Sequence, residues 1–282
     1  MAFLTIDQLA QHVQELPSLP DTTVRVLKMT DDPAASARDV SGAISTDMAL
    51  TSKVLKIANS AYYGMPRAVS TVNEAVLILG MSALRNLALA ASTYDMLRQE
   101  CAGYRMPVGE LWRHSLTCAT AAQIIARSTR AARAEEAFVA GLLHDVGKVV
   151  LNVHIAHQFQ TIIALAELDD MSFHDAEKLV LGFDHADVGA KVAEKWNLPA
   201  PLCQAICGHH CLENGKDSMN LTAIVHVANS ISRSDYSDLS GRPNEIALNP
   251  VAMSMLKLND DTLHNLHEEL VVHMTKVGST FE

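Results

Sequence analysis

The sequence predicts an all-α protein, and three observations carry that prediction. Apolar residues recur at the helical spacing i, i+3, i+4, i+7 along almost all of the 282 residues. The alternation of period two that is typical of strands is confined to few stretches. Glycine, proline and asparagine fall between the periodic segments, where turns are expected. With 49% hydrophobic residues, the chain can bury one large core or two modest ones.

The first half of the chain is expected to form six helices. A turn enforced by Pro17 and Pro20 separates the first two, and Asp21 can cap the second. The loop at 59–66 contains two adjacent tyrosines, which are interpreted as covering a helix end and receive no site role. The expected helices are 5–15, 21–31, one that begins near Ser36, one that follows Asp47 and stops at Asn59, 72–79 closed by Gly80, and 82–98.

A change of composition at 99–109, with two glycines and one proline, is the best candidate for a boundary between two halves. We therefore expect domains at 1–105 and 106–282. The segment 234–249 is polar and predicts a loop. Expected helices of the second half are 107–133, 135–152, 154–168, 172–182, 185–197, 199–212, 217–234 and 260–277.

Charge and composition exclude several classes of function. The formal charge is −10, and only 22 residues are lysine or arginine, so no basic surface is available for direct binding of nucleic acid. No apolar run approaches the roughly 20 residues that span a bilayer, and the N-terminus lacks the pattern of a secretion signal. A cytoplasmic protein without membrane contact is expected, with its five cysteines as reduced thiols.

The adjacent pair His144 and Asp145 lies within an otherwise apolar helical run. Burying both groups without partners would cost several kcal/mol, so something must compensate them. Metal ions are the favoured compensation, because histidine and aspartate are standard ligands. The alternative is a His–Asp hydrogen bond that ties two helices together.

Further polar residues could join this pair. Glu110 and His114 are four residues apart and share one helix face, whereas His144 and Asp145 would point about 100° apart on theirs. Adjacent ligands that diverge in this way suit more than one metal, or a bridging carboxylate. Lys148 could reach a substrate phosphate, with a solvated lysine as the alternative.

Downstream, two more places offer imidazoles. His185 is expected at a helix start with Asp184 as its cap, and His209 and His210 form a second adjacent pair. His226, in an apolar helix, is interpreted as a satisfied core histidine. Two cysteines, 203 and 207, are interpreted as small buried thiols. The histidines assigned to the surface are His12, His154, His157, His174, His264, His267 and His273.

Three further stretches stand out in the N-terminal half: LPSLP at 16–20, STDMALTSKVL at 45–55 running into ANSAYYG at 58–64, and EAVLILG at 74–80. Together with the polar residues above, they give the chain a resemblance, over nearly its full length, to the HDOD branch of the HD metal-dependent phosphohydrolase superfamily. It implies an N-terminal helical lobe packed on an HD-like lobe of many helices. The family occurs in bacterial signalling proteins, so signalling proteins are the implied partners.

Comparison with the similar HD-GYP cyclic-dinucleotide phosphodiesterases implies the site. Asn229 falls where that family has its last aspartate, and CLENG at 211–215 replaces the Gly-Tyr-Pro segment. An imidazole-rich set suits iron or manganese, with zinc as a further option, and two ions are expected. The implied metal ligands are Glu110, His114, His144, Asp145, His185, His209, His210 and Asn229, and the implied catalytic residues are Lys148 and Asp145.

Two functions follow from the resemblance. The first is a regulatory module that keeps the metal site and binds proteins or a nucleotide. The second is a phosphohydrolase acting on a nucleotide or cyclic dinucleotide, in which Lys148 stabilises the developing charge. Asn229 distinguishes them, because replacing aspartate by asparagine keeps an oxygen donor but removes one negative charge.

Overall fold

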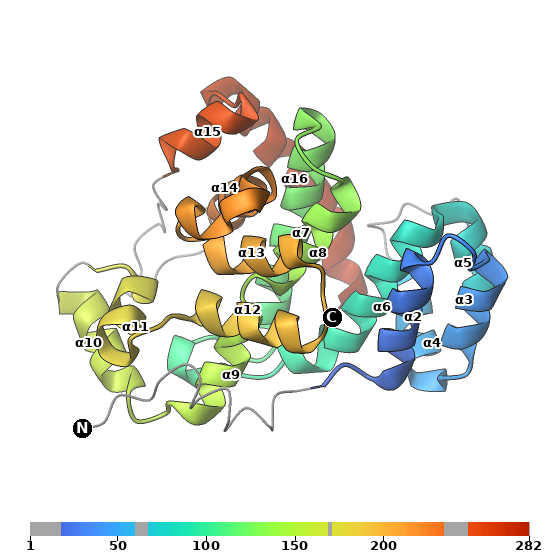
Figure 1. The fold of residues 1–282 in the computed structure, drawn as a ribbon, viewed down its shortest axis with the longest axis horizontal. Coiled ribbons are helices and arrows are strands. Elements are labelled where there is room, and N and C mark those ends of the chain that lie inside the picture. The colour runs from blue at the N-terminus through green and yellow to red at the C-terminus, as the bar shows by residue number, and fades with distance from the viewer. Residues whose placement is uncertain (1–17, 60–66, 169–170, 234–247, 282) are drawn as a thin grey trace. The chain divides into compact units, whose positions relative to one another are not determined.

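The computed structural model describes residues 18–59, 67–168, 171–233 and 248–281. These residues form α-helices, two 3₁₀ helices and turns, with one isolated bridge between Cys101 and Met106 (Figure 1). The all-α prediction is confirmed. The expected helix 5–15, His12, the two tyrosines of the loop 59–66 and nearly all of the loop 234–249 lie outside the described residues. Among the helices described, none combines the length and hydropathy needed to cross a bilayer.

The described chain contains two compact units, one comprising 18–95 with the residues from Asn265 onward, the other 96–264. A compact unit is defined by its internal contacts, so the domain boundary after residue 105 stays a prediction. The first unit holds α2 (Asp21–Asp31), α3 (Ala37–Ser45), α4 (Met48–Ala58), α5 (Val72–Leu79), α6 (Met81–Leu97) and the C-terminal part of α16 (Asp260–Phe281).

Capping residues fix the helix starts of the smaller unit. Ser36 forms a capping box with Asp39 at the start of α3, and Asp47 accepts the backbone N–H of Leu50 at the start of α4. The expected cap at Asp21 is wrong. Asp21 is already helical, Pro20 precedes it as N-cap, and no side chain caps α2.

The larger unit holds α7 (Glu110–Thr129), α8 (Ala134–Leu143), α9 (Val146–His154), α10 (Phe159–Leu168), α11 (Phe173–Leu181), α12 (His185–Lys195), α13 (Ala200–Gly208), α14 (Met219–Arg233) and α15 (Pro250–Leu256), with 3₁₀ helices at Ala102–Tyr104 and Leu212–Ser218. The sequence did not predict α15. Helix α7 is shorter than expected at both ends, because Gly109 and Arg130 adopt left-handed backbone conformations there.

The expected continuous helix 135–152 is the main error of the sequence prediction. The chain leaves α8 after Leu143 and enters α9 at Val146, so His144 and Asp145 form the junction between two helices. The backbone of Asp145 has φ −100° and ψ 9°, outside the helical region. A junction directs two adjacent side chains more freely than a helix would, and this allows both to serve one site.

Two glycines allow the helices around this junction to approach closely. A Cβ added to Gly141 would lie 2.9 Å from the carbonyl oxygen of Cys118 in α7. A Cβ added to Gly147 would lie 2.0 Å from the carbonyl oxygen of His185 in α12. Only glycine fits where backbone meets backbone at such distances. Helices α9 and α12 therefore touch through their backbones directly beside His185.

This contact predicts that Gly147→Ala destabilises the protein more than Gly189→Ala does. The new methyl group of Gly147→Ala meets immovable backbone, whereas that of Gly189→Ala meets the Cγ2 of Ile206 at 3.1 Å, which can shift. We expect Gly147→Ala to cost about 1–3 kcal/mol or more of unfolding free energy. Thermal and urea unfolding of the two variants measures the difference. Equal midpoints would contradict the close approach of α9 and α12.

Candidate metal centre

The carboxylate of Asp145 is the centre of the candidate site, and it is fully buried. Its Oδ2 atom lies 2.5 Å from Nζ of Lys148, 3.2 Å from Nε2 of His144 and 3.4 Å from Nε2 of His114. Lys148 is only 4% exposed, so the expected alternative of a solvated lysine is wrong. Its ammonium group also lies 5.6 Å above the ring of Tyr104.

The other carboxylate oxygen faces a second group of imidazoles. Oδ1 of Asp145 lies 3.3 Å from Nε2 of His185 and 3.8 Å from Nε2 of His209. Neither Oδ1 nor the Nε2 of His209 has a hydrogen-bond partner, although both atoms are buried. Asp145 therefore presents one oxygen to each of two sets of histidine side chains.

Hydrogen bonds at Nδ1 orient three of these imidazoles. Nδ1 of His144 donates to the carbonyl of Gly141 at 2.7 Å, and Nδ1 of His209 donates to the carbonyl of Ile206 at 2.7 Å. Nδ1 of His185 donates to the carboxylate of Glu177 at 2.6 Å. In the neutral form of each ring, the lone pair is therefore on Nε2. Metal-ligating histidines in proteins are held by this kind of bond.

Two clusters of possible ligands result. His114, His144 and Asp145 form the first cluster, and His185, His209 and His210 form the second, each with donor atoms within 4.8 Å of one another. Within the clusters, Nε2 of His114 lies 3.2 Å from Nε2 of His144, and Nε2 of His210 lies 2.9 Å from Nε2 of His185. Pairs of nitrogen atoms at such distances can share a cation or a proton.

Charge within the site is strongly coupled. Burial alone would raise the pKa of Asp145, but the charges of His144 and Lys148 outweigh burial and hold this pKa well below its usual range. Burial likewise opposes the charged form of His144, yet the Asp145 carboxylate raises the pKa of His144 to about 10. Burial, reinforced by the charge on His144, lowers the pKa of His209. A cation at the Nε2 atom of His144 would displace its proton.

The donor set fits a divalent metal. Two buried polar atoms without partners, Oδ1 of Asp145 and Nε2 of His209, carry a desolvation cost that a cation would relieve. Five imidazoles and one carboxylate suit iron, manganese or zinc better than magnesium. The geometry therefore accommodates a metal centre.

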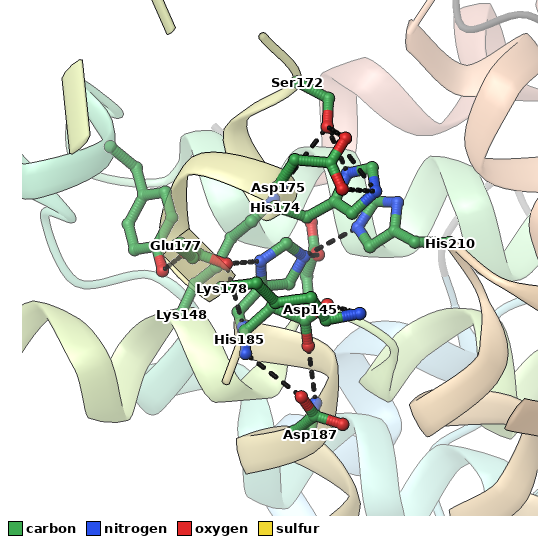
Figure 2. Close-up of polar contacts among 12 residues, drawn as sticks. Asp145, Lys148, Ser172, His174, Asp175, Glu177, Lys178, His185, Asp187 and His210 are labelled. Atoms are coloured by element: carbon green, nitrogen blue, oxygen red, sulfur yellow. Dashed lines mark hydrogen bonds and ion pairs between the residues drawn. The ribbon is translucent and has the colours of Figure 1, made fainter. Parts of the chain in front are cut away.

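Glu177 is a site residue that the sequence interpretation missed. Its buried carboxylate accepts the Nδ1–H of His185 and, at 2.9 Å, the backbone N–H of the same residue (Figure 2). It also accepts the hydroxyl of Tyr104. A signal was present in the sequence. Together with the buried residues Ala176 and Leu181, Glu177 lies on the inward stripe of α11, where an acidic residue requires partners.

Two expected ligands are not among the histidine and carboxylate groups of the two clusters. Glu110, in the first turn of α7, pairs with Nη2 of Arg113 at 2.7 Å. Asn229 is buried in α14, and its Oδ1 has no hydrogen-bond partner. Their roles as ligands stay predictions. Of the two side chains, Asn229 has the oxygen that is available to a metal ion, because the Glu110 carboxylate is already paired with Arg113.

The remaining histidines include one confirmed and one wrong interpretation. Both ring nitrogens of His226 are satisfied, because Nδ1 donates to the carbonyl of His209 at 2.9 Å and Nε2 accepts the N–H of Asn249 at 3.1 Å. His226 is thus a core histidine, as expected. His174, assigned to the surface, instead stacks on His210 with ring centroids 4.2 Å apart.

Comparison with known proteins was made on sequence and on structure. The HDOD domain model matches residues 16–212. A curated protein of Treponema pallidum (strain Nichols), described only as uncharacterised, is 26% identical over 227 residues, which are 80% of this chain and 44% of that protein. The chain thus spans less than half the length of this relative.

Solved structures share the fold over nearly the whole chain. An HDOD domain protein of unknown function from Geobacter sulfurreducens has a TM-score of 0.78 at 26% identity, with 97% of both chains covered. A protein of Shewanella amazonensis SB2B, provisionally named a phosphohydrolase, has a TM-score of 0.77 at 26% identity, covering 97% of this chain and 98% of that one. A provisionally named signal transduction protein of Marinobacter aquaeolei VT8 has a TM-score of 0.75 at 23% identity, covering 98% and 61%.

The network at Glu177 predicts that Glu177→Gln destabilises the protein even without metal. Its three donors need an acceptor at both oxygens, and an amide would turn an NH₂ group toward one of them. We expect a loss of about 1–3 kcal/mol in urea unfolding of chelator-treated protein.

The matched control for this prediction is Glu167→Gln, which removes the charge from a solvent-exposed pair with Arg105. Such pairs contribute about 0–1 kcal/mol. Equal losses of stability in the two variants would contradict a stabilising role for the buried hydrogen bonds of Glu177.

Proposed function

The chain belongs to the HDOD family, and on that premise we propose that it is a regulatory signalling module built on a dinuclear metal centre. It acts by binding proteins or a nucleotide. One observation supports the dinuclear centre most directly: the two oxygens of the buried Asp145 face two separate histidine clusters. A bridging carboxylate is the natural ligand between two ions.

Each cluster would hold one ion in this proposal. His114 and His144 would bind the first, His185, His209 and His210 the second, and Asp145 both. Residues of α7, α12 and the ends of α8 and α13 would hold the metal, which would supply positive charge that offsets the buried carboxylate. Asn229 remains a proposed ligand on account of its unsatisfied buried oxygen. Iron or manganese suits the set best, with zinc as the alternative.

Asn229 favours binding over turnover. The catalytic pattern that the chain resembles has an aspartate at this position, and asparagine leaves the ligand set one negative charge short. In addition, Lys148 is held at 2.5 Å by Asp145. Its ammonium group is therefore already neutralised by a residue of the site.

Phosphohydrolase activity is the second candidate function, and a specific observation favours it. Lys148 and the histidine clusters lie together around one carboxylate, which places a cationic side chain beside the groups that could hold metal ions. Lys148 could exchange Asp145 for a substrate phosphate and stabilise its developing charge. The name given to the structural neighbour from Shewanella amazonensis SB2B agrees with this candidate. Cyclic dinucleotides and nucleotides are the proposed substrates.

The metal centre predicts that His144→Ala loses metal-dependent stability. Protein purified without chelators should hold about two equivalents of metal, and Mn²⁺ at a hundredfold excess over Kd should stabilise it by about 2.7 kcal/mol for each bound ion. His144→Ala should lose the part of this gain that comes from the first ion, since it removes a buried donor nitrogen of the first cluster.

Elemental analysis and thermal unfolding with and without EDTA measure both effects. His157→Ala, at an exposed histidine of the same unit, is the control and should behave as the parent. Metal below about half an equivalent in the parent, with identical melting of both variants, would contradict an occupied centre.

The binding module predicts no hydrolysis by the parent protein. Protein loaded with Mn²⁺ or Fe²⁺ is incubated with a panel of cyclic dinucleotides and nucleotides, and products are followed by chromatography. Asn229→Asp restores the missing charge and is assayed beside the parent. Turnover by the parent that Lys148→Ala abolishes would replace the module by the enzyme. Turnover by Asn229→Asp alone would identify Asn229 as the residue that separates the two functions.

A further inference from the structure

Helix α11 begins with a compact polar arrangement at the edge of the second cluster. Ser172 caps the helix by accepting the backbone N–H of Asp175 at 3.2 Å, and its hydroxyl donates to the Asp175 carboxylate at 2.5 Å. The same hydroxyl lies 3.0 Å from Nδ1 of His174. Oδ1 of Asp175 lies 3.5 Å from Nε2 of His174. The cap therefore fixes the orientation of the His174 ring (Figure 2).

The face of that ring covers His210. The two imidazoles are stacked in parallel, with an interplanar angle of 3° and centroids 4.2 Å apart. Both ring nitrogens of His174 face Ser172 and Asp175, so His174 meets His210 through its π-face and not as a donor to a metal. A contact of this geometry holds a planar ring in place without competing for its Nε2.

His210 is the ligand that most needs such support. It lies beyond the end of α13, whose C-cap is His209, and it is half-buried where His185 and His209 are fully buried. To act as a ligand, His210 must keep its Nε2 in the second cluster. There it lies 2.9 Å from Nε2 of His185. Stacking on His174 restricts rotation of the ring about its side-chain bonds.

The same helix also orients His185, through Glu177. Two ligands of the second cluster therefore take their orientation from α11, whereas the first cluster is supplied by α7 and by the junction of α8 and α9. We propose that His174 is a positioning residue for His210, and that α11 thereby sets the occupancy of the second cluster independently of the first. The consequence for metal rests on the proposed function, but the positioning of His210 does not.

The positioning is tested first in chelator-treated, full-length protein. Carbethoxylation of His210 by diethylpyrocarbonate is followed by peptide mass spectrometry in the parent, His174→Ala and His174→Phe. His174→Ala should make His210 react faster, because the covering ring is gone, and His174→Phe should keep the parent rate, because a planar ring remains. Equal rates in the parent and His174→Ala would overturn the proposal.

The consequence for metal is tested by titrating the same three proteins with Co²⁺, whose d–d absorption reports each ion. His174→Ala should bind its first equivalent as the parent does and its second about 10–100-fold more weakly, the usual effect of losing an outer-shell partner. His174→Phe should bind both as the parent does. Unchanged binding of the second ion by His174→Ala, or equal weakening of both ions, would overturn control by α11. If the parent binds no Co²⁺, the proposed function fails and the modification rates alone decide the positioning.

Discussion

The structure of the larger unit depends on one buried negative charge. The carboxylate of Asp145 is surrounded by the ammonium group of Lys148 and by four imidazole nitrogens between 3.2 and 3.8 Å away. An isolated buried carboxylate would cost far more than a folded domain can tolerate, so every element that contributes a partner is constrained by it. Helices α7, α12 and the ends of α8 and α13 meet at this group.

The buried charge also constrains the hydrogen-bond acceptors that orient the surrounding imidazoles. Backbone carbonyls of Gly141 and Ile206 and the Glu177 carboxylate all accept from Nδ1 atoms, so the Nε2 atoms face inward. Each of these acceptors belongs to a helix whose own packing fixes it. The site is consequently pre-organised by backbone geometry as much as by side chains, which lowers the entropy cost of binding a ligand.

Much of this was accessible from the sequence. Periodicity and capping residues such as Ser36, Asp47 and Asp184 located the helices, and the pairing of histidine with aspartate pointed to the candidate site. The break between α8 and α9 at His144 could not be predicted, because an apolar run gives no sign of where tertiary packing interrupts a helix. The role of His174 was missed for a similar reason, because its stacking partner, His210, lies 36 residues further along the chain.

Gly147 is as important to the site as the ligands are when related sequences of this fold are compared. Any side chain at that position would separate α9 from α12, and would move Asp145 away from His185 even if both residues were retained. A related sequence that keeps every ligand but lacks this glycine would therefore have a dismantled centre. Glycine at this position binds nothing itself. Its presence in a related sequence nevertheless indicates an intact site better than the presence of the ligands does.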